Sequence, residues 1–139
     1  MTYGTSITLD APFADAVDKV RAALADQGFG VLTEIDVQAT MRAKLGVDLE
    51  PHLILGACNP PLAHQALEID PGIGLLLPCN VTVRVVNGRT VVSALDPQLM
   101  VQLPGRPALQ PVADEAGRRL DAALASLRAN GTAAFAEGG

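Results

Sequence analysis

The dipeptide Asn87-Gly88 is the sequence feature that most restricts the possible folds of this chain. Both residues tolerate positive φ, so an Asn-Gly pair between two apolar stretches is a strong signal for a two-residue type I′ turn. Residues 80–86 alternate valine with other residues, and residues 89–95 supply an apolar return segment. The sequence therefore predicts an antiparallel hairpin with strands at 80–86 and 89–95.

Helices and strands alternate in the residues that precede this hairpin. Period-two alternation of apolar residues indicates strands, and apolar residues three and four apart indicate helices. Gly28 and Gly46 each follow a helical pattern and are predicted to end it. The predicted strands are 3–9, 29–35 and 52–57, and the predicted helices are 13–27, 37–45, 62–69 and a long helix from Pro111.

Early mixing of helices and strands, followed by an antiparallel hairpin, indicates an α+β fold. We expect a single domain over residues 1–130, with a mostly antiparallel sheet and helices packed mainly on one face. Residues 131–139, rich in alanine and glycine, are predicted to form a flexible tail. The segment 52–57 lacks alternation, which predicts burial on both faces and a central position in the sheet.

The second face of the sheet is predicted to contact a partner. An uncovered sheet face must be polar or occupied, and segment 80–86 offers only Thr82 and Arg84 as polar residues on that face. A symmetric homodimer is therefore expected.

Composition excludes several classes of function. The chain has 139 residues, of which 49% are hydrophobic, with no Trp, one Tyr and three Phe, so a core must be largely aliphatic. A net charge of −5 without basic clusters argues against nucleic-acid binding, which needs Lys and Arg to neutralise phosphates. No secretory signal and no apolar run of about 20 residues is visible. We expect a cytoplasmic protein that does not bind membranes, with reduced cysteines.

Two similar motifs contain both cysteines of the chain. The apolar segment 53–57 leads into Cys58-Asn59-Pro60, and the apolar segment 73–77 leads into Pro78-Cys79-Asn80. A short helical segment separates them. We expect a ligand site where these two motifs end, and its predicted residues are Cys58, Asn59, Pro60, Pro78, Cys79 and Asn80.

The two thiols have several possible roles. They are soft ligands that suit Cu(I) or Zn(II), with His64 or His52 as a further ligand, or they could cycle to a disulfide. The spacing is not the tight pattern of recognisable zinc sites. Buried cysteine also serves as a small hydrophobic residue. The metal candidates are Cys58, Cys79 and His64, and the asparagines and prolines can equally serve to hold turns.

No catalytic constellation is apparent in the sequence. The acidic residues Asp114 and Glu115 lie in a predicted first helical turn, where carboxylates favour the helix dipole. Gly72-Ile73-Gly74 lacks the spacing of a phosphate-binding loop. We predict no catalytic residues, the sequence leaves the cofactor unknown, and an enzyme of unknown reaction is the last of three hypotheses.

The paired Cys-Asn motifs carry a resemblance to a known family. Together with the run 74–80 and with Asp96-Pro97, they resemble the bacterial and archaeal family called domain of unknown function 302, over about residues 5–128. The resemblance implies a compact α+β fold, a dimer and a small stand-alone protein, but no activity. The leading hypothesis is a homodimeric module that binds an apolar or metal-containing small ligand, and the alternative is a thiol-dependent redox or soft-metal protein.

Overall fold

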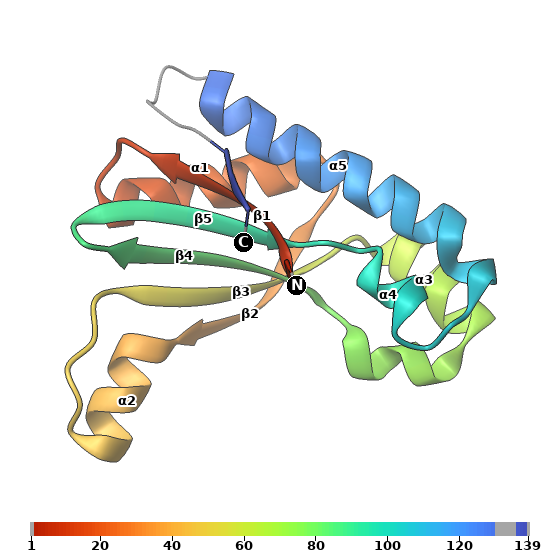
Figure 1. Ribbon diagram of the computed structural model, residues 1–139, viewed down its shortest axis with the longest axis horizontal. Helices are drawn as coiled ribbons and strands as arrows, with labels where there is room; N and C mark the ends of the chain where they lie inside the picture. Colours follow the sequence, from red (N-terminus) through yellow and green to blue (C-terminus); the bar gives the residue numbers. More distant parts are fainter. Residues whose placement is uncertain (1, 130–135, 139) are drawn as a thin grey trace.

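The computed structural model describes residues 2–129 and 136–138, and one antiparallel sheet organises them (Figure 1). Every strand pairs with its neighbours in antiparallel fashion, in the order β2-β3-β4-β5-β1-β6. The strands are β1 (Gly4–Leu9), β2 (Gly30–Asp36), β3 (His52–Cys58), β4 (Cys79–Val86), β5 (Arg89–Leu95) and β6 (Ala136–Gly138).

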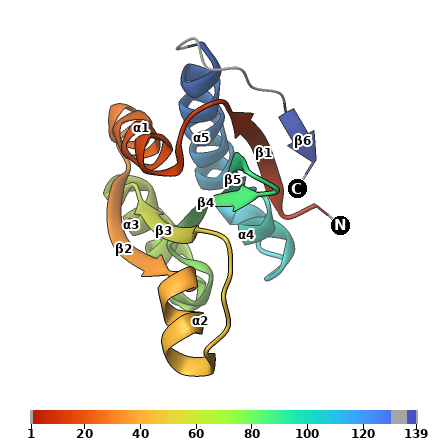
Figure 2. The same cartoon turned by 90° about the vertical axis from the view of Figure 1, so that its left-hand side faces the viewer.

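The two longest helices, α1 and α5, lie on one face of this sheet, whereas α2 lies on the opposite side (Figure 2). This arrangement confirms the predicted α+β class. No helix in residues 2–129 and 136–138 combines the length and apolar character needed to cross a membrane. The helices are α1 (Phe13–Asp26), α2 (Val37–Leu45), α3 (Pro60–Ile69), α4 (Leu99–Gln102) and α5 (Gln110–Ala129), with 3₁₀ helices η1 (Pro71–Leu76) and η2 (Pro107–Leu109).

The hairpin predicted from the Asn-Gly pair is confirmed. Strands β4 and β5 pair from Val86 and Arg89 outward, which leaves a two-residue turn. Asn87 has φ of 51° and Gly88 has φ of 79°, the positive values that this turn requires. The hairpin lies in the interior of the sheet, where β4 also pairs with β3 and β5 also pairs with β1.

Capping residues determine where the helices begin and end. The side chain of Asp36 accepts a hydrogen bond from the backbone N–H of Ala39 and so caps α2, and Gly46 ends that helix with φ of 67°. Gly28 follows α1 with φ of 83°. These caps were all expected from the sequence.

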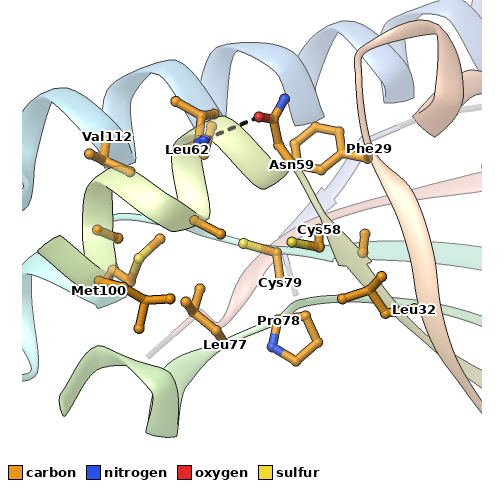
Figure 3. A pocket seen from close by; sticks show the side chains of 15 residues that line it. Phe29, Leu32, Cys58, Asn59, Leu62, Leu77, Pro78, Cys79, Met100 and Val112 are labelled. Carbon is orange, nitrogen blue, oxygen red and sulfur yellow. Dashed lines mark hydrogen bonds between the residues drawn. The ribbon is translucent and has the colours of Figure 1, made fainter. Parts of the chain in front are cut away.

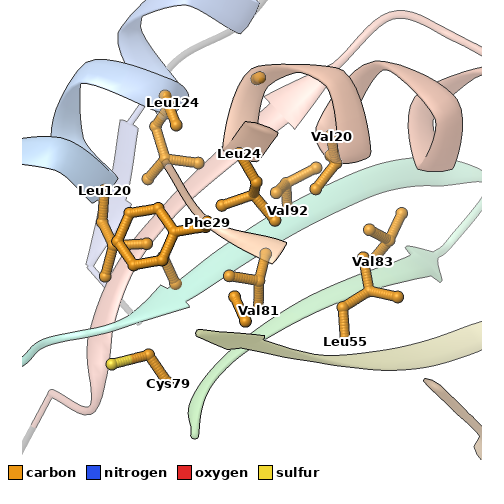
Figure 4. Packing of buried hydrophobic residues seen from close by; sticks show 14 of the residues in the cluster. Val20, Leu24, Phe29, Leu55, Cys79, Val81, Val83, Val92, Leu120 and Leu124 are labelled. Carbon is orange, nitrogen blue, oxygen red and sulfur yellow. The ribbon is translucent and has the colours of Figure 1, made fainter. Parts of the chain in front are cut away.

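The core lies between α1, α5 and the sheet, and it is aliphatic as the composition predicted (Figure 4). Helical residues point down onto valines of the central strands, and each fully buried side chain of this size contributes about 1.5–3 kcal/mol. The main contributors include Val20, Leu24, Leu120 and Leu124 from the helices and Leu55, Val81, Val83 and Val92 from the sheet.

Strand β3 differs from its prediction. It lies inside the sheet between β2 and β4, with α1 and α5 on one side of the sheet and only the short helix α2 in partial contact with β3 on the other. Leu53, Leu55 and Ala57 are buried, whereas Ile54 is only half-buried. Gly56 is buried because neighbouring side chains, not a helix layer, approach it closely. The missing alternation therefore reflects local packing.

The predicted flexible tail, residues 131–139, lies partly outside the described residues. Within it, Ala136–Gly138 forms the short strand β6, which pairs with residues 5–7 of β1. An edge strand presents unpaired N–H and C=O groups, and pairing satisfies them. A strand therefore replaces a tail at these three residues.

Candidate functional site

Antiparallel pairing brings the two Cys-Asn motifs together. Strand β3 ends at Cys58 and strand β4 begins at Cys79, so the end of one neighbour lies beside the start of the other. Cys79 pairs directly with Ala57, which places Cys58 one residue further along the same ladder. The connection between the two strands holds α3 and η1, and α3 forms the far side of the site.

An apolar cavity of about 250 Å³ lies between this end of the sheet, α3 and α5 (Figure 3). The sulfur atoms of Cys58 and Cys79 both face into it. Leu32 and Leu67, which are 67% and 40% exposed, belong to its rim, so the cavity opens to the surface. It is lined by Phe29, Leu32, Ala57, Cys58, Asn59, Leu62, Ala63, Ala66, Leu67, Leu77, Pro78, Cys79, Met100, Val112 and Ala116.

Asn59 is the polar residue in this lining, and its side chain already stabilises the start of α3. Oδ1 of Asn59 accepts a hydrogen bond from the backbone N–H of Leu62, 3.2 Å away, and so caps α3. Asn59 is also buried. Among the described residues that line the cavity, none is acidic or basic. The wall therefore suits an apolar ligand.

Burial keeps both thiols protonated. It raises the pKa of Cys58, and it raises the pKa of the more deeply buried Cys79 to about 11, with the charge on Cys58 as a second cause. Because thiolates are the nucleophilic and metal-binding form, these cysteines are poor nucleophiles at neutral pH. Both are free thiols.

The cavity wall is held on one side by a polar cluster beside Asn59. Nη1 of Arg119 donates a hydrogen bond to the carbonyl oxygen of Gln27, 3.2 Å away, and Nε of Arg119 donates to Glu115 at 2.7 Å. A Cβ at Gly28 would lie 3.0 Å from both Nη1 of Arg119 and Nδ2 of Asn59. The end of α1, the start of α3 and the middle of α5 therefore lie close together at Gly28.

Hydrogen bonds also keep the Glu115 carboxylate of this cluster ionised. Bonds from Arg118 first, and then from Arg119, lower the pKa of Glu115 to about 2. The carboxylate therefore stays ionised over the physiological range and holds the guanidinium of Arg119 in place.

Close packing fixes the opposite wall, where Pro78 lies against Gly56. A Cβ at Gly56 would lie 2.2 Å from Oγ1 of Thr33 and 2.8 Å from Cγ of Pro78. Glycine is therefore required at this position for β2 and the Pro78 turn to approach β3. The peptide bond between Leu77 and Pro78 is cis.

Four of the six residues predicted for the ligand site line the cavity: Cys58, Asn59, Pro78 and Cys79. The other two do not. Pro60 is exposed in the first turn of α3, where its fixed φ suits a helix start. Asn80 is exposed and points to the face of the sheet opposite α1 and α5, because successive residues of a strand face opposite sides.

The predicted metal ligands are not all brought together. Nδ1 of His64 lies 3.2 Å from Oε1 of Glu68 on the exposed arc of α3, away from the cavity. His52 lies on the face of the sheet opposite α1 and α5, where burial and then Arg84 lower its pKa. In residues 2–129 and 136–138, no three His, Cys, Asp or Glu side chains are grouped to hold a metal ion.

Most of the cavity wall was not predicted as a site. Sequence patterns did show that residues of segment 62–69 share one apolar arc and that Val112 and Ala116 share a stripe of the last helix. Such patterns are typical of core residues. They do not show whether the apolar face of a helix contacts another element or borders a cavity. Met100 had no sequence signal of this kind.

Fold and site define a small α+β protein with one antiparallel sheet and an apolar cavity at the sheet end. The chain belongs to the family described as Domain of unknown function DUF302, whose model matches residues 5–127. The family predicted from the Cys-Asn motifs is therefore confirmed.

The chain is also similar to a solved structure. This is the crystal structure of an uncharacterized conserved DUF302 protein from Bacillus stearothermophilus, with 29% sequence identity and a TM-score of 0.85. The match covers 92% of this chain and 100% of that chain. No curated protein matches the chain. The comparisons thus support the fold and family.

Proposed function

We propose that the protein is a binding module that holds a small apolar molecule in the cavity between Cys58, Cys79 and α3. The observation that carries this proposal is a cavity of about 250 Å³ whose walls are almost entirely apolar. An empty apolar cavity has a cost, because its wall atoms lose dispersion contacts and protein interiors are otherwise close-packed.

Size and chemistry limit the class of ligand. An engineered apolar cavity of roughly 150 Å³ in another protein stays dry and binds benzene. The present cavity is larger than that and smaller than the roughly 300–1,000 Å³ of sites for drug-sized molecules. A one- or two-ring aromatic compound, or an aliphatic compound of similar size, matches it. With no acidic or basic lining residue, binding is favoured over catalysis.

A titration followed by ¹H–¹⁵N NMR tests this proposal. Benzene and indole are added to the protein, with phenol-sized polar compounds as the comparison series. The expected result is saturable shifts at Cys58, Cys79 and Ala66, without matching shifts on the sheet face opposite α1 and α5. Absence of saturation by every apolar compound, or shifts spread over the whole surface, would refute the proposal.

The second candidate function is a thiol-dependent one, and the two sulfur atoms facing one cavity favour it. In that case the protein would bind a soft metal ion such as Cu(I), or its two thiols would form a disulfide by passing two electrons and two protons to an external disulfide, which is reduced to two thiols. The raised pKa values of both cysteines oppose it, because metal binding and thiol exchange need the thiolate.

Mass spectrometry of the native protein distinguishes the two candidates. A thiol function predicts a bound metal that a chelator removes, or a loss of two hydrogens on oxidation. Apolar binding predicts that benzene binds equally well with and without chelator. We place such a module in the cytoplasm, where its free thiols would stay reduced.

A further inference from the structure

A second hollow lies on the face of the sheet opposite α1 and α5. Its volume is about 360 Å³, and none of its lining residues also lines the apolar cavity. The sequence offered Thr82 and Arg84 as the polar residues on this face of segment 80–86, and the homodimer expected through this face stays a prediction. Antiparallel pairing adds polar residues from the neighbouring strands. The polar lining of this hollow consists of Ser6, His52, Asn80, Thr82, Arg84 and Ser93.

The strand register determines how these polar groups are arranged. Arg84 of β4 is directly opposite His52 of β3. Two residues earlier in β4, and on the same face, Thr82 is opposite Ser93 of β5, which is in turn opposite Ser6 of β1. A row of three hydroxyl groups therefore crosses three neighbouring strands. This row lies roughly 7 Å along the strand from Arg84, because a strand rises about 3.4 Å per residue.

The hydroxyl row has a hydrogen atom left to donate. Oγ of Ser6 and Oγ of Ser93 form one hydrogen bond of 2.7 Å, in which either oxygen can be the donor. Each hydroxyl carries one hydrogen, so the serine that accepts this bond keeps its own hydrogen for another acceptor. Ser6 is buried and Ser93 is half-buried. With Ser6 as the donor, the hydrogen of Ser93 is therefore available to a ligand.

Arg84 gives the hollow a positive charge that no carboxylate of the described residues neutralises. Its side chain is half-buried and takes part in none of the ion pairs of residues 2–129 and 136–138. The acidic residues of β1 to β5 have other contacts: Glu34 pairs with an arginine of α1 at 3.0 Å, and Asp36 caps α2. Glu50 accepts hydrogen bonds from the β4–β5 turn, and Glu137 belongs to β6, three strands away from β4.

One positive charge beside a row of hydroxyl groups suits a hydroxylated monocarboxylate. A guanidinium group binds a carboxylate through two parallel N–H···O hydrogen bonds. Hydroxyl side chains can donate to and accept from the hydroxyl groups of a ligand. Burial and then Arg84 lower the pKa of His52, so this imidazole is neutral at pH 7 and adds no second charge. The net charge of the hollow therefore matches a monoanion better than a phosphate dianion.

We propose that this hollow binds a small polyhydroxylated carboxylate, with its carboxylate on Arg84 and its hydroxyl groups on Thr82 and Ser93. The separation of roughly 7 Å between these two parts of the hollow is spanned by a chain of several carbon atoms, as in gluconate. The site lies apart from the apolar cavity, so it adds a second kind of ligand and does not depend on the proposed function.

A ¹H–¹⁵N NMR titration with gluconate tests this proposal, and sorbitol, in which a CH₂OH group replaces the carboxylate, is the uncharged counterpart. We expect saturable shifts at Thr82, Arg84 and Ser93 with gluconate, and none with sorbitol. Arg84→Gln should weaken gluconate binding by about tenfold or more, because hydrogen bonds between charged groups are the strong ones. The matched control is Arg128→Gln, which removes the same charge from an exposed position of α5 on the other side of the sheet. It should leave gluconate binding unchanged.

Thr82→Val tests the hydroxyl contact separately, because it removes the hydroxyl group and keeps the shape of the side chain. It should weaken gluconate binding by about three- to tenfold and leave the binding of acetate, which has no hydroxyl group, unchanged.

Equal shifts with gluconate and sorbitol, or equal weakening by Arg84→Gln and Arg128→Gln, would overturn the carboxylate site. Tighter binding of inorganic phosphate than of gluconate would overturn the ligand class. Benzene titration of Arg84→Gln separates the two sites of the protein. This variant should bind benzene like the wild type, and a parallel loss of benzene and gluconate binding would refute a separate site.

Discussion

Filling the cavity from α5 should stabilise the protein and abolish its ligand binding at the same time. Ala116 is buried, lines the cavity and lies on a regular helix. The substitution Ala116→Leu adds three carbons that can enter empty apolar space. Alanine and leucine have similar helix propensities, so the helix itself changes little.

The expected magnitude follows from the added carbons. Each buried methylene contributes about 0.8 kcal/mol, so three give an upper value of about 2 kcal/mol of added stability. The control is Ala113→Leu on the same helix, because Ala113 is also buried but does not line the cavity. Overpacking a close-packed site costs typically 1–3 kcal/mol, so the control should be destabilised.

Urea unfolding of the wild type and the two variants measures these changes, and benzene titration measures binding. Ala116→Leu should raise the free energy of unfolding and weaken benzene binding by at least about tenfold. If Ala116→Leu is destabilised as much as Ala113→Leu and still binds benzene like the wild type, the cavity is not the site.

Three further predictions concern residues around the cavity. Below pH 9.0 Cys79 is protonated in both the folded and unfolded states. Between pH 9 and about 11 only the unfolded state loses this proton, which favours unfolding. Over this range the free energy of unfolding of the wild type should fall by about 2–3 kcal/mol. The Cys79→Ala variant should not show this fall, and urea unfolding at a series of pH values measures it. Asn59→Ala should cost about 1 kcal/mol through the lost cap of α3, and Asn59→Asp should retain most of it; equal losses in both variants would contradict a capping role. Gly56→Ala should cost about 1–3 kcal/mol and be partly rescued by Thr33→Ala, and simple additivity in the double mutant would exclude the proposed clash.

Local signals predicted the parts of the fold that depend on few residues. The Asn-Gly turn specifies its φ values by itself, and the caps at Asp36 and Gly46 act within one turn of their helix. The family was also recognisable, because the two Cys-Asn motifs are short and specific. These features can be predicted without knowing which residues pack against them.

The segment 73–77 shows where such local patterns mislead. Its apolar run looks like the run before Cys58, but most of it forms the 3₁₀ helix η1, in which Ile73 is buried and Leu75 is 92% exposed. The likeness between the motifs arises differently in space: Cys58 ends one strand, and Cys79 begins its antiparallel neighbour. Antiparallel pairing, rather than repetition, brings the thiols together.

The cavity itself could not be predicted from the sequence. Its existence depends on how far α3 and α5 lie from the end of the sheet, and this distance results from tertiary packing. One such tertiary contact is the Arg119–Gln27 hydrogen bond, which joins α5 to the end of α1. Residues such as Ala66 and Val112 have the same pattern whether they meet a neighbour or an empty space. The sequence therefore predicted that the thiols and the turn at Pro78 belong to one site, but only the structure shows the cavity beside them.

A crystal structure of the protein soaked with iodobenzene shows whether the cavity binds an apolar molecule, because anomalous scattering locates the iodine atom. We expect one iodine site inside the cavity, in contact with Cys58, Cys79 and Ala66, and we expect Ala116→Leu to remove it. A cavity that stays empty or holds ordered water, with iodine bound only elsewhere on the surface, would contradict this expectation.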